Sequence, residues 1–166
     1  MKNYWCMQMH PTEQQEWALA HTVDALSRGI IGFGYGDDDP GDLRQPDPAS
    51  RRRCGTLHPH EVLFATEMQK EDLVLVFAHN RPFALACVDG PYVYLSSPLP
   101  QLSKYQWLTH VRVVRQVTYF DDQPKDIRDL NKNIQMTSTL QELVNEDKLT
   151  RRLMEAWWEH VKDVAF

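Results

Sequence analysis

The sequence predicts an α+β fold in which a small mixed β-barrel is surrounded by helices and followed by a helical C-terminal segment. Apolar and β-branched runs of strand length recur between residues 4 and 120. The turn-like sequence 79–82 joins two of these runs as a hairpin. Helical patterns interrupt the runs at irregular intervals, without the alternating rhythm of a parallel α/β sheet. This order favours a mixed or antiparallel barrel.

The first three expected elements are a strand, a helix and a second strand. Residues 4–9 read as a strand whose side chains alternate between two faces. A helix begins at Thr12, which can form a capping box with Gln15, and ends at residues 28–29. The second strand spans residues 28–36. The apolar stripe expected on the buried side of the helix consists of Trp17, Leu19, Ala20, Val23 and Leu26.

The middle of the chain contains a long loop and the clearest strands. Residues 36–56 are rich in Asp, Pro and Arg, and a loop of this length is either functional or disordered. The nearly continuous apolar run at 71–78 predicts a strand buried on both faces. The alternation of a later strand shifts phase near Val114, as a β-bulge would cause. The other elements expected here are a helix at 59–68 and strands at 83–88, 92–95 and 110–120.

From about residue 124 the apolar spacing becomes helical. We expect a short helix at 126–133, a second that starts with a capping box at Thr139, and a third at 148–164. A chain of 166 residues suits one domain with its own core, so we expect residues 1–166 to form a single domain. The apolar side of the last helix contains Leu149, Leu153, Met154, Trp157 and Val161.

Composition excludes several classes of protein. The mean hydropathy is -0.52, and no apolar run approaches the roughly 18 residues that cross a bilayer. The N-terminus has no signal-peptide core, so we expect a cytoplasmic protein. Three widely spaced cysteines do not form a disulfide framework. The formal net charge of -5 argues against a protein that grips nucleic acid mainly through phosphates.

The stretch 28–36 combines aromatic residues with glycines at alternate positions. In a strand, Phe33 and Tyr35 share one face, and the glycines at 32, 34 and 36 leave the other face bare. Glycines in strands mark a place where a ligand or another backbone comes close. The stretch is therefore a candidate aromatic wall of a binding site, or a core strand that ends in a flexible loop.

Several landmarks occur in an order that resembles the EVE/YTH-like branch of the PUA superfamily, especially the domains found in modification-dependent restriction and antiviral defence systems. The similarity covers roughly residues 1–120 and extends at most to Leu143. Two positions depart from the family pattern: Glu71 stands where glycine is usual, and Tyr35 stands where many relatives have tryptophan. The landmarks are Trp5 in the opening strand, Ile31-Gly-Phe-Gly-Tyr35, Met68-Gln-Lys-Glu-Asp72, Val88-Asp-Gly-Pro-Tyr92 and His110-Val-Arg-Val-Val114.

The resemblance implies a non-catalytic reader of a modified nucleobase, in DNA rather than RNA. Such a reader accepts one base flipped out of the nucleic-acid stack into an aromatic pocket. No cofactor is implied. The residues that would bind the base are Tyr35, Trp5, Trp107, Phe33, Asn80 and Asp89, and those that would contact the nucleic-acid backbone are Arg51, Arg52, Arg53, Arg112 and Arg115.

Two other functions remain open at this point. One is a protein interaction module on the same fold, which the acidic net charge favours. The other is a nucleic-acid-processing enzyme that uses the acidic loop 37–39 together with Asp42. These acids lack the spacing of a recognisable metal loop. Residues 54, 58 and 60 offer Cys, His and His but no fourth zinc ligand nearby, so we assign no metal site.

The adjacent pair Trp157-Trp158 suggests a contact with another protein. Neighbouring residues on a helix point about 100° apart, so if one ring packs on the barrel the other tends to face outward. A reader without catalytic residues needs a separate effector. We therefore expect the C-terminal helix to bind an effector protein or a second copy of the chain.

Overall fold

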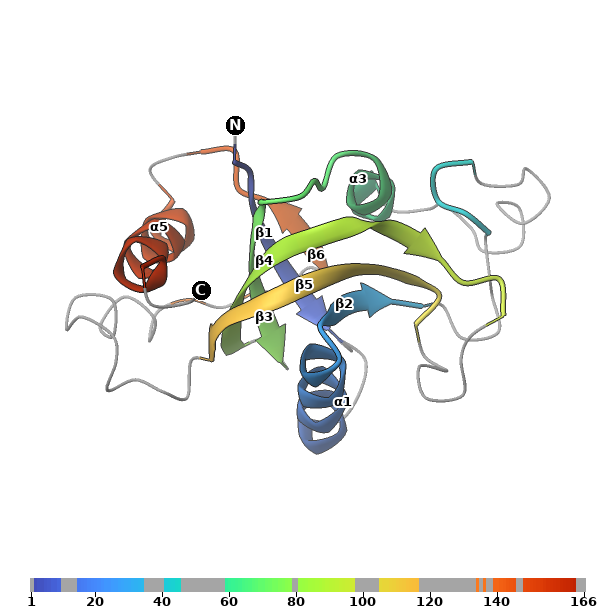
Figure 1. The fold of residues 1–166 in the computed structure, drawn as a ribbon, viewed down its shortest axis with the longest axis horizontal. Helices are drawn as coiled ribbons and strands as arrows, with labels where there is room; N and C mark the ends of the chain where they lie inside the picture. The colour runs from blue at the N-terminus through green and yellow to red at the C-terminus, as the bar shows by residue number, and fades with distance from the viewer. Residues whose placement is uncertain are drawn as a thin grey trace.

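A computed structural model defines a mixed α+β fold (Figure 1). This confirms the predicted fold class. The structure describes residues 2–9, 15–34, 41–45, 59–78, 81–97, 105–116, 134, 136, 139–145 and 148–163. The elements are β1 (Tyr4–Met9), α1 (Gln15–Ser27), β2 (Ile30–Phe33), α3 (Pro59–Thr66), β3 (Leu73–Ala78), β4 (Arg81–Tyr94), β5 (Trp107–Gln116), β6 (Leu140–Glu142) and α5 (Leu149–Val161).

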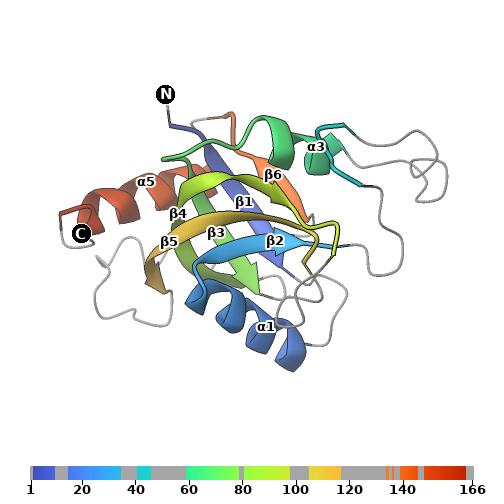
Figure 2. The ribbon, with the colours of Figure 1, turned by 45° about the vertical axis from the view of Figure 1, so that its right-hand side comes forward.

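The six strands form one sheet in the order β2-β5-β4-β3-β1-β6. β1 and β3 run parallel, and every other neighbouring pair is antiparallel. The sheet is strongly twisted and curved (Figures 1 and 2). Among the described residues, β2 and β6 lie at opposite ends of this hydrogen-bonded order.

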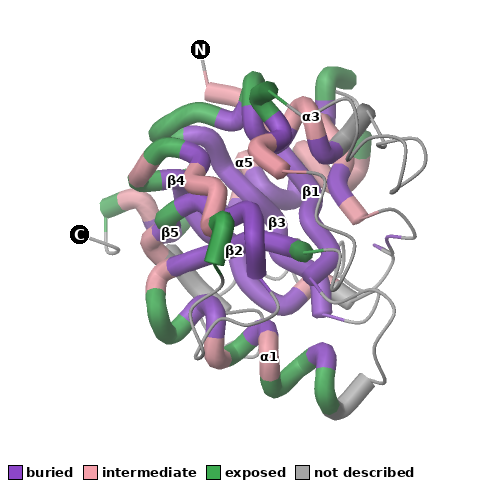
Figure 3. The backbone as a smooth tube through the Cα atoms, turned by 90° about the vertical axis from the view of Figure 1, so that its right-hand side faces the viewer, coloured by how far each residue is buried: buried purple, intermediate pink, exposed green. Residues whose placement is uncertain are grey.

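Each face of the sheet contributes to a separate hydrophobic cluster. One cluster receives side chains from all six strands and from α1 and α3, as expected for the inner face of a curved sheet. The other joins β1, β3 and β4 to α5. Alternation along β1 explains the division: Trp5 and Met7 enter the first cluster, and Cys6 enters the second. β3 is buried at every position, as its apolar run predicts (Figure 3).

The prediction for the buried side of α1 was wrong at every residue it named except Leu26. Trp17 is 61% exposed, and Leu19 and Val23 are each 42% exposed. The buried side instead consists of Ala18, Thr22, Ala25 and Leu26, so mostly small side chains face the sheet. The buried Thr22 hydroxyl donates a hydrogen bond to the Ala18 carbonyl at 2.7 Å, which compensates its loss of water.

The helix ends where the sequence predicts. Gly29 has a φ of 67°, a left-handed conformation that favours glycine. Its N–H donates to the Leu26 carbonyl at 3.0 Å. The turn leads directly into β2, whose edge pairs with β5.

β4 and β5 form a long irregular hairpin. The predicted separate strands at 83–88 and 92–95 are one continuous strand, β4, whose register shifts between Val88 and Tyr92. In β5, Arg115 pairs with Leu85 and Val113 pairs with Ala86, so Val114 is the extra residue of a bulge. This confirms the phase shift predicted at Val114.

The capping-box prediction at residue 139 was also wrong. Residues 140–142 form β6, which pairs antiparallel with β1. The Gln8 N–H donates to the Thr139 carbonyl at 2.8 Å, and the Leu143 N–H donates to the Tyr4 carbonyl at 2.7 Å. The edge of β1 offers backbone hydrogen bonds that outweigh the local helix signal. The helix expected at 126–133 lies outside the described residues.

α5 agrees with its predicted apolar side. Leu153, Met154, Trp157 and Val161 are buried against the sheet. Trp158 is half-buried, and the Lys2 ammonium lies 3.8 Å from the centre of its ring. Among the described residues, no helix has both the length and the apolar character needed to cross a membrane.

Candidate functional site

Asp72 fixes the turn that enters β3. Its buried carboxylate accepts hydrogen bonds from the Trp5 indole N–H at 2.9 Å and from two backbone N–H groups, of Asn3 at 2.9 Å and of Gln69 at 3.0 Å. Three donors compensate the burial of the carboxylate. The landmark Asp72 therefore ties β1 to the turn at 67–72.

Glu71 occupies a backbone conformation that favours glycine. Its φ is 75°, in the left-handed region where a Cβ atom is disfavoured. Its carboxylate lies 3.1 Å from the Arg112 guanidinium of β5. Glutamate at this position therefore combines an unfavourable backbone conformation with an ion pair from the turn to β5.

Aromatic rings from four elements meet in the first cluster. The Trp107 and Phe33 ring centroids are 5.8 Å apart, and Tyr94 stacks on Trp107 at 6.5 Å and 19°. Phe33 contacts Phe64 of α3 at 5.0 Å, and Phe64 meets Tyr92 edge-on at 5.9 Å. We call these packed rings the aromatic wall.

This wall anchors the middle of the long loop. The Trp107 indole N–H donates to the Gly41 carbonyl at 2.8 Å, and the Leu43 N–H donates to the Tyr92 hydroxyl at 3.1 Å. The Leu43 side chain is fully buried. Residues 41–45 are therefore held against the sheet, and they present Arg44 to the solvent side of Tyr92.

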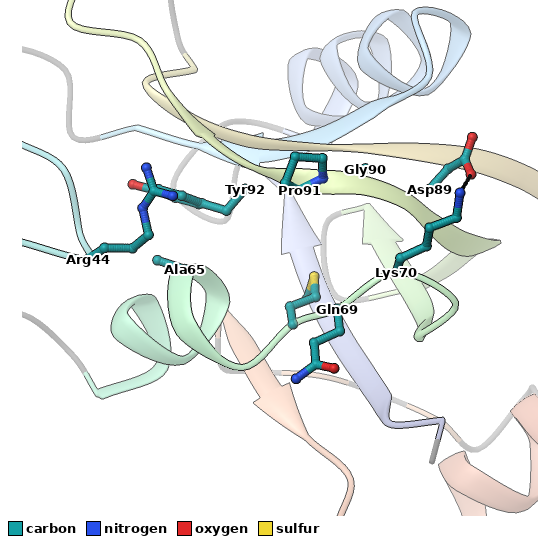
Figure 4. Close-up of a pocket in the computed structure, with 9 residues that line it drawn as sticks. Arg44, Ala65, Gln69, Lys70, Asp89, Gly90, Pro91 and Tyr92 are labelled. Atoms are coloured by element: carbon teal, nitrogen blue, oxygen red, sulfur yellow. Dashed lines mark ion pairs between the residues drawn. The ribbon is translucent and has the colours of Figure 1, made fainter.

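A cavity of about 410 Å³ lies between α3, the turn at 67–70 and β4 (Figure 4). Its floor consists of the buried residues Ala65, Met68 and Tyr92. The residues at its rim are Arg44, Gln69, Lys70, Asp89, Gly90 and Pro91. The cavity thus combines an apolar and aromatic floor with a charged, solvent-exposed rim.

Ion pairs and a cation–π contact organise the rim. The Arg44 guanidinium lies 5.0 Å from the centre of the Tyr92 ring and 3.0 Å from the Asp42 carboxylate. Lys70 and Asp89 pair at 3.3 Å (Figure 4). Burial raises the pKa of Tyr92, so its hydroxyl stays neutral. Burial alone would raise the pKa of Asp42, but its hydrogen bonds to Arg44 outweigh burial and lower it.

The structure brings together some of the predicted base-binding residues. Phe33 and Trp107 meet in the aromatic wall, but both rings are buried. Trp5 is fully buried, with its indole N–H bound to Asp72. Asp89 lies at the cavity rim. Tyr35 and Asn80 lie outside the described residues.

The predicted backbone contacts and partner residues are distributed as follows. Arg112 is paired with Glu71, beside the cavity turn. Arg115 is described only as a backbone position that pairs with Leu85 in the sheet. Residues 51–53 lie outside the described part of the chain. Trp157 is buried, whereas Trp158 is half-exposed.

The glycine at 32 makes room for protein backbone. A Cβ atom there would lie 2.3 Å from the Trp107 carbonyl oxygen of β5. The sequence suggested that a strand glycine makes room either for a ligand or for another backbone. At Gly32 the neighbour is the backbone of β5.

Sequence reasoning missed the roles of Arg44, Gln69, Lys70 and Tyr92. Tyr92 is the last residue of the landmark segment 88–92, and its place there is the signal that could have identified it. Arg44 lies in a polar loop with no pattern that separates it from its neighbours. Asp42, which the acidic-loop alternative uses, forms an ion pair with Arg44 at 3.0 Å. In the described ranges, no three His, Cys, Asp or Glu side chains lie close enough to hold a metal ion.

Comparisons with known proteins gave structural similarities only. No protein-family model and no curated protein sequence matches the chain. A structure of the YTH domain of Zygosaccharomyces rouxii MRB1 in complex with N6-methyladenosine RNA is 13% identical, with a TM-score of 0.43 over 93% of this chain and 85% of that one. A structure of human THYN1 in complex with DNA containing 5-methylcytosine is 12% identical, with a TM-score of 0.41 over 93% of this chain and 98% of that one.

Proposed function

We propose that residues 1–166 form one EVE/YTH-like domain of the PUA superfamily that reads a modified base without catalysing a reaction. The base belongs to DNA rather than RNA, and the protein serves as the recognition module of a cytoplasmic restriction or antiviral defence system. One observation carries the proposal. The cavity beside α3 and β4 has Arg44 layered on Tyr92 at its edge and apolar side chains at its floor.

The cavity suits one flat heterocycle. Its volume of about 410 Å³ falls within the range of about 300–1,000 Å³ typical of small-ligand sites. A base inserted there stacks on the Arg44 guanidinium, which Tyr92 supports from behind; flipped bases stack on both arginine planes and aromatic rings. Stacking contributes about 1–3 kcal/mol per base, and this offsets the few kcal/mol needed to extrude it.

The predicted site residues take different roles in this proposal. Asp89 offers acceptors to the edge of the base at the rim. Phe33 and Trp107 support the cavity from inside the cluster, and Trp5 acts through Asp72. The base contacts proposed for Tyr35 and Asn80 and the phosphate contacts of Arg51, Arg52, Arg53, Arg112 and Arg115 remain part of the proposal.

Fluorescence anisotropy with matched oligonucleotides tests this function. Single-stranded and duplex DNA and RNA carry 5-methylcytosine, 5-hydroxymethylcytosine or N6-methyladenine at one position, and the unmodified sequences serve as references. We expect one modified DNA to bind at least tenfold more tightly than its reference. Arg44→Ala should reduce that preference by about tenfold, since it removes the stacking plane. The matched control is Arg28→Ala, which removes an exposed arginine from the turn after α1. Equal affinity for every oligonucleotide would refute the reader.

A protein interaction module is the second candidate, favoured by large apolar side chains that are exposed on α1. Trp17, Leu19 and Val23 share this helix with a buried side of small residues. Contiguous apolar patches on a protein surface mark interaction sites, and we propose that these side chains contribute to one. An effector or second copy could bind there, or on α5 at Trp158. Light scattering of wild type, Trp17→Ser and Trp158→Ala tests this. A monomeric mass for all three, together with selective DNA binding, would favour the reader alone.

A further inference from the structure

Two basic side chains at or next to the cavity rim form ion pairs with carboxylates. Lys70 pairs with Asp89 at 3.3 Å, and Arg112 pairs with Glu71 at 3.1 Å. Lys70 and Asp89 lie at the cavity rim. Glu71 follows Lys70 in the turn before β3, so the Glu71–Arg112 pair lies next to the rim.

Asp89 links the two pairs electrostatically. Burial alone would lower the pKa of Arg112, but its hydrogen bond to the Cys87 sulfur and the charges of Glu71 and Asp89 outweigh burial and raise it. Asp89 therefore acts on Arg112 as well as on Lys70. The four residues form a small network in which two carboxylates neutralise two cations.

These ion pairs are open to exchange. The Lys70, Asp89 and Glu71 side chains are 65%, 50% and 51% exposed, and that of Arg112 is 35% exposed. Exposed pairs of this kind contribute little stability, so a phosphate group can replace a carboxylate at little cost to the fold. The cations are therefore reachable, but only by a ligand that displaces the carboxylates.

Stability alone does not explain the carboxylate at position 71. Glu71 adopts a φ of 75°, where glycine would be unstrained. A residue held in an unfavourable conformation by its surroundings points to a functional constraint. Here the constraint is consistent with keeping a negative charge beside Arg112.

We propose that Glu71 and Asp89 are specificity-determining residues which occupy the positions of nucleic-acid phosphates at Lys70 and Arg112. The proposal rests on the reader function. An unmodified strand gains only phosphate contacts, and the carboxylates offset these by repulsion and by competing for the cations. A strand whose modified base enters the cavity has stacking energy in addition, and it displaces the carboxylates. The chain thereby restricts stable binding to modified strands despite its cationic rim.

Substitutions that neutralise the carboxylates test this mechanism. Glu71→Gln, Asp89→Asn and the double variant are titrated with an unmodified single-stranded oligonucleotide and its modified counterpart at two salt concentrations. Affinity for the unmodified strand should rise about threefold for each single change and about tenfold for the double variant. Because phosphates can take the positions that the carboxylates held at Lys70 and Arg112, the dependence of log K on log salt should steepen by about 0.7 per added contact. The preference for the modified strand should fall.

The matched control is Asp24→Asn. It removes the same charge from another exposed ion pair, with Arg28 on α1, away from the cavity. We expect Asp24→Asn to change the affinity for either oligonucleotide by less than twofold. Urea unfolding verifies that all variants fold. If the cavity variants behave like Asp24→Asn while wild type still prefers modified DNA, the role of Glu71 and Asp89 is refuted and the reader survives. If the variants gain affinity but wild type shows no preference, the reader fails and the phosphate exchange is supported.

Discussion

Replacement of Glu71 by glycine is expected to give a more stable protein than replacement by alanine. Both changes remove the same ion pair with Arg112, so its contribution cancels in the comparison. The difference comes from the backbone. At a φ of 75°, alanine meets a steric penalty of about 1–2 kcal/mol that glycine avoids. Glycine loses about 0.4–1 kcal/mol through the greater freedom of its unfolded chain.

The expected difference in the free energy of unfolding is therefore about 1 kcal/mol in favour of Glu71→Gly. Urea denaturation monitored by tryptophan fluorescence measures it, and a thermal scan should show a difference of about 2–4 °C for a chain of this size. Ala20→Gly in α1 is the matched control, because the same exchange in an exposed helix should destabilise by about 1 kcal/mol. A Glu71→Ala protein as stable as Glu71→Gly would refute the backbone argument.

Two other substitutions and one reagent test the packing of the fold. Asp72→Ala should lower the free energy of unfolding by about 3–5 kcal/mol, since the Trp5 indole and two backbone N–H groups lose their acceptor; urea denaturation measures it, and a loss below 1 kcal/mol would contradict the role of Asp72. Gly32→Ala should cost about 2–3 kcal/mol because its Cβ would overlap the Trp107 carbonyl, and an unchanged denaturation midpoint would show that β5 moves freely. Burial raises the pKa of Cys6 to about 12, against a weaker opposing effect of Lys148, so iodoacetamide at pH 8.5 should label Cys6 only after unfolding, as read by peptide mass spectrometry. The folded state keeps this proton when the unfolded state loses it near pH 9, so the thiol's contribution to stability should fall as pH rises from 9 to 12; rapid labelling of the native protein would contradict both statements.

The sequence identified most strands because their signals are local. The apolar run at 71–78 contains enough Leu and Val to predict a strand buried on both faces, and β3 is such a strand. The phase shift at Val114 marks an inserted residue, and the bulge occurs there. Periodicity also placed the buried side of α5 correctly, since its large apolar residues fall on one side only.

Local signals failed where a neighbouring element decided the outcome. The apolar residues of α1 occupy much of its circumference, so spacing could not tell whether Trp17 or Ala18 faces the sheet. Close approach of the helix to the sheet selects the small residues. At residues 140–142, the unpaired edge of β1 offered backbone partners that the capping-box pattern could not anticipate.

The candidate site shows the same division. The order of landmarks along the chain indicated a reader and singled out Asp89 and Arg112, which lie at or beside the cavity rim. The resemblance also marked position 71 as a departure from the family pattern. The geometry does not relieve that departure, because the backbone there is left-handed and favours glycine.

By itself, the sequence determined the α+β class, the positions of most strands and the acidic character of the chain. These properties depend on composition and on the spacing between neighbouring residues. Only the tertiary structure decided which face of α1 is buried, which rings are exposed, and that Arg44, Lys70 and Tyr92 surround one cavity. The physical reason is separation along the chain. Arg44 meets Tyr92 across 48 positions through the anchoring of Leu43 in the core, and contacts of that range leave no periodic trace in the sequence.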